Sequence, residues 1–343
     1  MSAQSGDSAD MSALPFLRLL VAGVSTLTLV PLASLVYFYN TKPEIIIRAI
    51  RKAVIWRAGL TVRFVTVEGY RLAYAERGRP SDTQPSVVFL HGFSTSKDTW
   101  ANFIKALPQN LHIIPLDLPG HGESDRNPGQ DLSMEGMANT LHRFVCAVGL
   151  DRKPFHLVGT SMGGGIAGLY AAAYRSNIAL LTLFCPLGVV TPVHSRMMRA
   201  FLEGRNMLVP KTLDDFREMT EINSYRYKIG KLKLPDKLLY CALADRAPHN
   251  DFFQKLSDEL GRKEKWDVLQ RSMGNISAPT HVIWGREDDV LDVSGAEVVR
   301  EGVPNCRLDI LDDCGHVLVN EKTRQAVAVF IDFREGVLNG YKK

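Results

Sequence analysis

Most of this chain alternates short apolar runs with stretches in which apolar residues recur at helical spacing. Six apolar runs are typical of buried strands, and they lie at residues 86–90, 111–118, 154–160, 179–185, 280–285 and 307–313. Ahead of them, residues 61–69 and 71–78 read as two further strands that form a hairpin joined at Gly69 and Tyr70. The pattern therefore predicts eight strands.

Helical spacing fills the intervals between the runs. One predicted helix follows the first run and has apolar residues at i, i+3, i+4 and i+7: Trp100, Phe103, Ile104 and Leu107. Another follows the next run and buries Met134, Met137, Leu141, Val145 and Val148. This alternation predicts an α/β fold with a mostly parallel, doubly wound sheet, helices on both faces and the opening hairpin at one edge.

One interval is much longer than the others. Residues 191–276 separate two predicted strands, and a loop of that length without structure is implausible. Helical spacing, for example within residues 251–260, predicts a helical cap over the carboxyl ends of the strands, where open α/β sheets bind ligands. The core then comprises residues 61–190 and 277–343. Four cap methionines suit an adaptable apolar cavity, although ordinary packing explains each equally well: Met197, Met198, Met207 and Met219.

The N-terminal part contains an apolar stretch of another kind. Residues 19–39 carry no charge and are long enough to span a bilayer as a helix. A cleaved signal peptide would need a basic leading segment, whereas residues 1–18 hold two aspartates and a single arginine. The pattern predicts an uncleaved transmembrane anchor rather than a signal peptide or a buried core helix, with residues 1–18 as a short non-cytosolic N-terminus.

The net charge of +4 is concentrated beside this stretch. Residues 40–60 hold five basic side chains against Glu44, so the rest of the chain is neutral. A neutral body with one basic patch favours a membrane surface over a nucleic acid, for which no motif is present. Because basic residues remain inside, the body is predicted to face the cytosol, with residues 40–60 as a basic juxtamembrane helix. The sequon at Asn275 would be open to glycosylation if the body were lumenal.

Composition adds limits on the chemistry. The chain is 45% hydrophobic over 343 residues, which allows a sizeable core in one or two domains. Its five scattered cysteines form neither a disulfide framework nor a metal-binding spacing, so reduced thiols and no metal are predicted: Cys146, Cys185, Cys241, Cys306 and Cys314. Nothing in the sequence indicates the oligomeric state.

The heptapeptide GTSMGGG at residues 159–165 fits two incompatible motifs. Residues 159–163 fit G-x-S-x-G, the turn that presents a nucleophilic serine, and residues 163–168 fit the dinucleotide-binding G-x-G-x-x-G. The second motif needs an acidic residue about 20 positions onward, and none occurs between Leu169 and Leu202. No cofactor is therefore predicted. Gly159 and Gly163 instead supply the room that a sharp strand-to-helix turn at Ser161 requires.

Partners for Ser161 follow in the order that this architecture requires. An acid is expected after the strand at 280–285, where Asp288 is the first choice, Asp289 the second and Asp292 the third. The base is expected after the last strand, where His316 lies.

The sequence also predicts an oxyanion hole and a reaction. Its backbone N–H donors are expected at Met162, after the nucleophile, and at Phe93, in the loop after the strand at 86–90. His91, in the same loop, is expected to have a structural role. The chemistry is acyl transfer: Ser161 attacks a carbonyl while His316 accepts its proton. This chemistry requires neither metal nor cofactor.

Four segments carry a family resemblance: HGFSTSKDTW, PFHLVGTSMGG, IWGREDDVLDVSGA and CGH. Together they make residues 60–335 resemble the membrane-anchored monoacylglycerol lipases of the α/β-hydrolase superfamily. The resemblance implies that Ser161, Asp288 and His316 are the nucleophile, acid and base, and that Phe93 and Met162 are the oxyanion donors. It further implies hydrolysis of monoacylglycerols to fatty acid and glycerol, with some action on lysophospholipids, at a cytosolic membrane face of late endosomes, lysosomes or the plasma membrane.

The sequence leaves several alternatives open. A lysophospholipase or an acyl thioesterase would use the same triad and differ only in the leaving group. A C–C bond hydrolase of aromatic-ring breakdown shares the serine turn and the cap, but a membrane anchor has no place in that reaction. A non-catalytic binding module is disfavoured because every member of the triad is present at its expected place. The acyl chain and the glycerol position that are preferred do not follow from the sequence.

Overall fold

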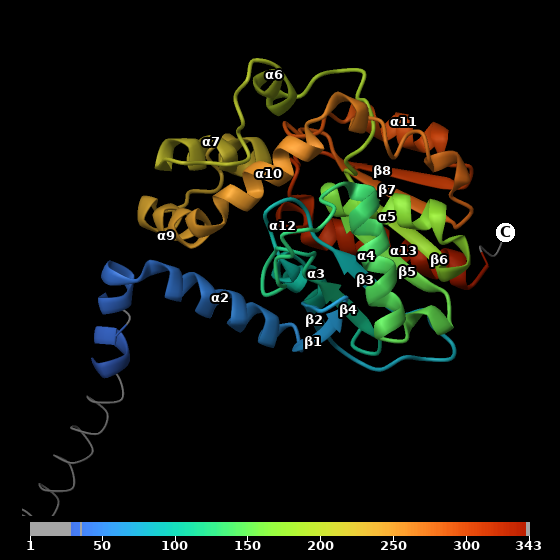
Figure 1. The fold of residues 1–343 in the computed structure, drawn as a ribbon, viewed down its shortest axis with the longest axis horizontal. Coiled ribbons are helices and arrows are strands. Elements are labelled where there is room, and N and C mark those ends of the chain that lie inside the picture. The colour runs from blue at the N-terminus through green and yellow to red at the C-terminus, as the bar shows by residue number, and fades with distance from the viewer. Residues whose placement is uncertain (1–28, 35, 341–343) are drawn as a thin grey trace, which may run out of the picture.

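An eight-stranded sheet forms the centre of the structure, a computed structural model that describes residues 29–34 and 36–340 (Figure 1). The strands lie side by side in the order β1-β2-β4-β3-β5-β6-β7-β8. Their bounds are β1 Thr61–Val67, β2 Tyr70–Glu76, β3 Val87–Leu90, β4 Ile113–Leu116, β5 Phe155–Thr160, β6 Ile178–Phe184, β7 Thr280–Gly285 and β8 Cys306–Leu311.

The pairing matches the pattern of apolar runs. Strands β1 and β2 form an antiparallel hairpin at one edge, and β2 meets β4 antiparallel. All remaining neighbours are parallel, which places the carboxyl ends of β3 to β8 along one side of the sheet. The predicted eight-stranded, mostly parallel sheet with its hairpin at the edge is confirmed. The short strands β3 and β4 are buried at every residue, as continuous apolar runs predict.

Helices cover both faces of the sheet. On one face α4 and α5 pack against each other, and on the opposite face α3 packs against α13 (Figure 1). The core helices are α3 Ala101–Ala106, α4 Met134–Ala147, α5 Met162–Ala173, α11 Ser294–Gly302, α12 Leu318–Glu321 and α13 Thr323–Leu338. The helix predicted from the spacing of Trp100, Phe103, Ile104 and Leu107 begins earlier and ends one residue sooner than that spacing indicates. It consists of a 3-10 turn, Lys97–Trp100, followed by α3, and it ends before Pro108, whose ring disfavours a helical residue ahead of it.

Aromatic packing joins the helices of that second face to the sheet. Phe89 on β3 lies 4.9 Å from Trp100, and Phe103 on α3 lies 5.4 Å from Phe330 on α13, measured between ring centroids. Phe184 at the end of β6 completes the cluster, 5.6 Å from Trp100. These contacts hold the segment after β3 against the core, just beyond the loop that adjoins Ser161.

Between β6 and β7 the chain forms a separate helical layer beyond the carboxyl ends of the strands (Figure 1). Its helices are α6 Arg196–Leu202, α7 Leu213–Asn223, α8 Tyr225–Lys228, α9 Asp236–Arg246 and α10 Asn250–Leu260. Hydrogen bonds near the start of this layer join it to the loop after β7. The Ser195 hydroxyl donates to the Val290 carbonyl at 2.7 Å, and the Met197 N–H donates to the Asp289 carbonyl at 2.9 Å.

The N-terminal part is helical where the structure describes it. Residues 29–34 and 36–41 are helical, and α2 spans Pro43–Arg57. The C-terminal end of α2 packs into the core through Ile55, whereas Ile50 is 48% exposed. Within the described residues, no helix is both long and apolar enough to cross a membrane. Residues 1–18, and residues 19–28 and 35 of the predicted anchor, lie outside the described residues.

Candidate active site

Ser161 occupies the sharp turn between β5 and α5. Its φ of 54° and ψ of −121° lie in a region that residues other than glycine seldom adopt. Three hydrogen bonds fix the turn: the Ser161 N–H donates to the Phe184 carbonyl at 2.9 Å, and the Ser161 carbonyl accepts from Gly165 at 3.0 Å and Leu187 at 2.9 Å. The serine is thereby held at the carboxyl edge of the sheet.

Close backbone packing explains the glycines around this turn. A Cβ atom on Gly159 would collide with the Gly163 carbonyl, and a Cβ on Gly163 would collide with the His91 carbonyl. A Cβ on Gly92 would lie only 3.2 Å from Cβ of Ser161. The turn and the loop after β3 can approach this closely because all three positions lack a side chain.

His316 and Asp288 form a buried pair in the loops after β8 and β7. The distance from His316 Nδ1 to Asp288 Oδ2 is 2.7 Å, and both residues are buried. The other carboxylate oxygen, Oδ1, accepts the backbone N–H groups of Val290 at 2.8 Å and Leu291 at 2.9 Å. Asp288 is therefore held by its own loop and presents one oxygen to the imidazole.

The structure distinguishes the three acids that the sequence left as candidates. Asp289 forms an ion pair with Lys228 of the cap, and Asp292 accepts the Ser294 N–H at 2.9 Å. Asp288 is the one that contacts His316. The arrangement thus favours the first choice for the acid.

The pKa of His316 reflects opposing effects. Burial disfavours the charged imidazolium, whereas the charge and hydrogen bond of the Asp288 carboxylate favour it, and the pKa lies well above the ordinary value of 6.5. The Cys185 sulfur contributes in the same direction only as a thiolate. Because burial raises the pKa of Cys185, that thiol is neutral near pH 7, and we attribute the shift to Asp288.

The expected oxyanion donors lie on either side of Ser161. Met162 is the first residue of α5, so its N–H has no acceptor within the helix. Among the described residues, neither the Met162 N–H nor the Phe93 N–H donates a backbone hydrogen bond. Both residues line a cavity that reaches Ser161, which leaves two donors available to a developing oxyanion.

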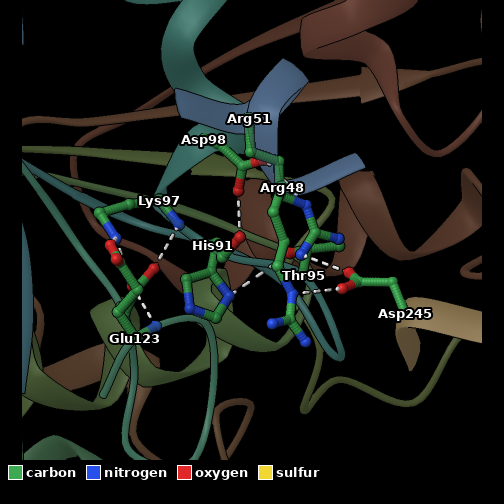
Figure 2. A network of polar contacts seen from close by, with 10 residues as sticks. Arg48, Arg51, His91, Thr95, Lys97, Asp98, Glu123 and Asp245 are labelled. Carbon is green, nitrogen blue, oxygen red and sulfur yellow. Dashed lines mark hydrogen bonds and ion pairs between the residues drawn. The ribbon is translucent and has the colours of Figure 1, made fainter. Parts of the chain in front are cut away.

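His91 holds the loop that carries Phe93. Its Nδ1 lies 2.8 Å from the Gly92 carbonyl, and its Nε2 accepts the Leu118 N–H at 2.9 Å. Burial lowers the pKa of His91 to about 4, so the ring is neutral at physiological pH. Figure 2 shows this ring beside Thr95. The contacts agree with the structural role expected from the sequence.

A buried ion pair between Lys97 and Asp117, which the sequence did not indicate, holds the C-terminal end of the loop that carries Phe93. Lys97 Nζ lies 2.6 Å from Asp117 Oδ2 and 2.7 Å from Glu123 Oε2. The Lys97 N–H also donates to Asp117 Oδ1 at 2.7 Å. Asp117 thereby ties the loop after β3 to the loop after β4.

Two cavities meet at Ser161. The methionine cavity lies under α6 and is lined by the predicted Met197, Met198 and Met207, together with Leu187 and Val189. The arginine cavity, on the other side, is lined by residues that include His316, Asn223, Arg226, Arg246 and Met219. Phe93, Ser161, Leu208 and Val290 line both cavities.

Arg246 is the most notable of these lining residues, and no sequence motif pointed to it. It is largely buried, and burial lowers its pKa to about 10. Its guanidinium donates to the Ser94 hydroxyl and the Leu208 carbonyl, while its Nε has no partner among the described residues. A buried cation therefore lies beside the candidate nucleophile.

The described residues bring together one set of potential metal ligands: Cys185, Asp288 and His316. Their ligand atoms lie within 4.8 Å of one another. These groups are already engaged. The Cys185 thiol lies 3.6 Å from the His316 carbonyl, and His316 is bonded to Asp288. The arrangement fits a proton-transfer pair better than a metal site.

Comparison with protein families and curated proteins identifies close relatives. The model of the α/β-hydrolase fold family matches residues 85–323. Human monoacylglycerol lipase ABHD6 is 39% identical over 293 residues, which cover 83% of this chain and 86% of the relative. Monoacylglycerol lipase abhd6-B of Xenopus laevis is 39% identical over 325 residues, covering 92% of this chain and 93% of the relative.

Solved structures with the same fold include a lipolytic enzyme. A bacterial membrane phospholipase A is 30% identical and superposes with a TM-score of 0.80, covering 94% of this chain and 99% of that one. A meta-cleavage product hydrolase from Pseudomonas fluorescens IP01 superposes with a TM-score of 0.64 at 21% identity, covering 79% and 96%. At that identity the second likeness concerns the fold alone.

The His316–Asp288 pair generates a pH prediction for hydrolysis of a soluble ester such as p-nitrophenyl butyrate. A general base must be neutral, so kcat/KM should fall as the pH drops through the raised pKa of His316. Asp288→Asn removes the charge that favours the imidazolium. We therefore expect the acid limb of the profile to move to lower pH. We also expect kcat to fall about 10⁴-fold, because the tautomer of the His316 imidazole is no longer fixed.

Asp289→Asn is the matched control, since it removes one carboxylate from the same loop without contacting His316. It should leave both the acid limb and kcat near those of the wild type. An acid limb that moves in Asp289→Asn and stays in place in Asp288→Asn would contradict the assignment of the pair.

Proposed function

The chain belongs to the α/β-hydrolase family and, within it, to the ABHD6 group of monoacylglycerol lipases, and we propose that it hydrolyses monoacylglycerols to free fatty acid and glycerol. The observation that carries the proposal is the buried His316–Asp288 pair in the cavity wall beside the strained Ser161. A serine, a base and an acid in these relative positions are the components of acyl transfer.

Acylation follows from the roles of these groups. Ser161 Oγ attacks the ester carbonyl while His316 accepts its proton, and Asp288 stabilises the resulting imidazolium. The N–H groups of Phe93 and Met162 bind the oxyanion of the tetrahedral intermediate. Collapse of the intermediate breaks the C–O bond of the ester, and His316 gives its proton to the departing glycerol oxygen.

Deacylation repeats the sequence with water. His316 removes a proton from a water molecule, which attacks the acyl carbon on Ser161. The same two N–H groups bind the second oxyanion, and the proton on His316 returns to Ser161 Oγ. Fatty acid leaves, and the resting serine is restored.

The two cavities suggest how a lipid ester lies across Ser161. Methionine, aliphatic and aromatic side chains make up most of the lining of the methionine cavity, which also includes Arg205 and Lys265, and this largely apolar lining suits a fatty acyl chain of variable shape. The arginine cavity contains amide and guanidinium groups, which suit the hydroxyls of glycerol. We assign the acyl chain to the first cavity and the leaving alcohol to the second.

Lysophospholipids are a second candidate substrate class. Arg226 and Arg246 in the arginine cavity supply the charge that a phosphate-bearing leaving group requires. The likeness to the bacterial membrane phospholipase A, at 30% identity, supports this candidate.

We further propose that residues 19–39 anchor the protein in a membrane and that the hydrolase body faces the cytosol. Leu29, Val30, Leu32 and Val36 are each more than half exposed, and such apolar surface is normally covered by lipid or protein. The basic residues that follow, between 40 and 60, favour the cytosolic side.

The decisive experiment measures fatty acid release from a panel of lipid esters by mass spectrometry. The panel comprises mono-, di- and triacylglycerols, lysophospholipids and acyl thioesters in detergent micelles. Wild type is expected to release fatty acid fastest from monoacylglycerol. Ser161→Ala should lower kcat by about 10⁶, because it removes the nucleophile.

Other outcomes of the panel would change the proposal in defined ways. Faster Ser161-dependent release from lysophospholipid would replace the first substrate class with the second. Faster Ser161-dependent release from thioesters would contradict both. Release that persists in Ser161→Ala would remove Ser161 as the nucleophile.

Narrowing the methionine cavity tests the placement of the acyl chain. Met198→Trp adds bulk to the wall of this cavity. We expect kcat/KM for a long-chain monoacylglycerol to fall at least tenfold, and kcat/KM for an acetyl ester to change less than twofold, because only the long chain must enter the cavity. Equal losses for both esters would contradict this placement.

The sequon at Asn275 tests the orientation. Asn275 is exposed in a 3-10 turn, so it would be accessible to glycosylation in a lumenal body. The full-length protein expressed in eukaryotic cells should show no glycosidase-sensitive mass shift. A shift that disappears in Asn275→Gln would contradict a cytosolic body.

A further inference from the structure

Helix α2 is joined to the cap by a two-to-one ion pair. Asp245, near the end of α9, lies 3.1 Å from Arg48 Nε through Oδ1 and 2.9 Å from Arg51 Nη1 through Oδ2. Figure 2 shows both arginines converging on this carboxylate. The Asp245 side chain is only 6% exposed, whereas those of Arg48 and Arg51 are 60% and 46% exposed. Helix α2 therefore supplies the charges that neutralise a buried acid of the cap.

We define residues 91–96, which include Phe93, as the oxyanion loop. Helix α2 is also joined to the 3-10 turn that follows this loop. Arg51 Nε lies 3.4 Å from Asp98 Oδ2, in the 3-10 turn at 97–100. Asp98 in turn accepts the hydroxyl of Ser96, the last residue of the loop. One arginine on α2 thus contacts both the cap and the support of the oxyanion loop (Figure 2).

The cap end of this connection also leads to the oxyanion loop. Arg246 follows Asp245 in the chain, and its guanidinium donates to the Ser94 hydroxyl. Ser94 has a φ of 55°, which is an unfavourable backbone conformation for serine and needs support from its surroundings. Ser94 directly follows Phe93, one of the two assigned oxyanion donors. Both routes from α2 therefore end within a few residues of the Phe93 N–H.

Energetic considerations indicate that the connection matters. An exposed ion pair by itself contributes little to stability. A buried carboxylate that loses one of its two partners is different, because Arg48 then compensates its charge only in part and the other oxygen must regain hydration by a shift of its surroundings. Movement of Asp245 toward water would displace the adjacent Arg246 and release Ser94.

We propose that helix α2 positions the oxyanion loop, with Arg51 as the positioning residue that joins Asp245 of the cap to Asp98 beside the loop. The helix that links the body to the N-terminal segment is then also part of the catalytic framework. This inference rests on the proposed function, because it assigns a role in stabilising the oxyanion on Phe93.

The expected effect is on kcat. Loss of one oxyanion donor typically lowers kcat by 10²–10³, and a displacement of about 1 Å can lower the rate about 10²-fold. Arg51→Ala displaces a donor without removing it. We therefore expect kcat to fall between about 10-fold and 100-fold and KM to change less than about twofold.

The experiment uses the full chain in detergent micelles with p-nitrophenyl acetate, a soluble ester whose hydrolysis does not depend on access to a bilayer. Active sites are counted by titration with a fluorophosphonate, so that kcat refers to correctly folded enzyme. Lys52→Ala is the matched control, because it removes a neighbouring exposed cation on α2 for which the described residues show no ion pair. Lys52→Ala should retain the wild-type kcat.

Two further variants distinguish positioning from simple destabilisation. Arg51→Lys keeps the positive charge but loses the planar guanidinium, whose several N–H groups contact Asp245 and Asp98 at once. The kcat of Arg51→Lys should therefore lie between those of Arg51→Ala and the wild type. Asp98→Asn combined with Arg51→Ala should lower kcat less than the product of the two separate effects, because both interrupt one connection.

The outcomes separate this inference from the proposed function. A kcat per titrated site in Arg51→Ala within twofold of wild type would overturn the inference and leave the proposed function intact. So would a loss of equal size in Lys52→Ala. A wild-type enzyme without Ser161-dependent hydrolysis would overturn both.

Discussion

The close approach of three backbone segments around Ser161 is the constraint on which the candidate site depends. The end of β5, the start of α5 and the loop after β3 pack so tightly that there is no room for a Cβ atom at Gly159 or Gly163, and a Cβ at Gly92 would be crowded against Ser161. This packing forces the unusual φ of Ser161 and brings the Phe93 loop beside it. The candidate nucleophile and the candidate oxyanion donors are thus positioned by one feature of the backbone, and the candidate acid and base come from loops after other strands.

The sheet and the cap contribute different parts of the candidate site. The sheet positions Ser161, Asp288 and His316 in loops after its strands, while the cap supplies most of the lining of the methionine cavity and part of the lining of the arginine cavity. The layers remain coupled, because Met197 of the cap bonds to the backbone of the loop that carries Asp288. A change in the cap can therefore reach the acid of the candidate triad as well as the substrate.

Much of this arrangement could be predicted because it is encoded locally. Continuous apolar runs identified the strands, and the glycines at 159 and 163 identified the turn that bears Ser161. The choice of Asp288 over Asp289 could not be derived from the sequence. Adjacent aspartates are chemically identical, and only their burial and their hydrogen-bond partners distinguish them. Arg246 and the Lys97–Asp117 pair were also missed. They act through contacts between segments far apart in the chain, and no local pattern marks them.

The long insertion between β6 and β7 has a consequence for biosynthesis. Ser161 lies ahead of the insertion, and Asp288 and His316 lie behind it. During translation the strands up to β6 can pair while the remainder is still being synthesised, so a nascent chain can contain the candidate nucleophile without the candidate base. β7 can join β6 only after the entire cap has emerged, and the entropy of closing that loop grows only slowly with its length. Hydrolytic competence thus arises as one of the last events of synthesis, when most of the chain is already outside the ribosome.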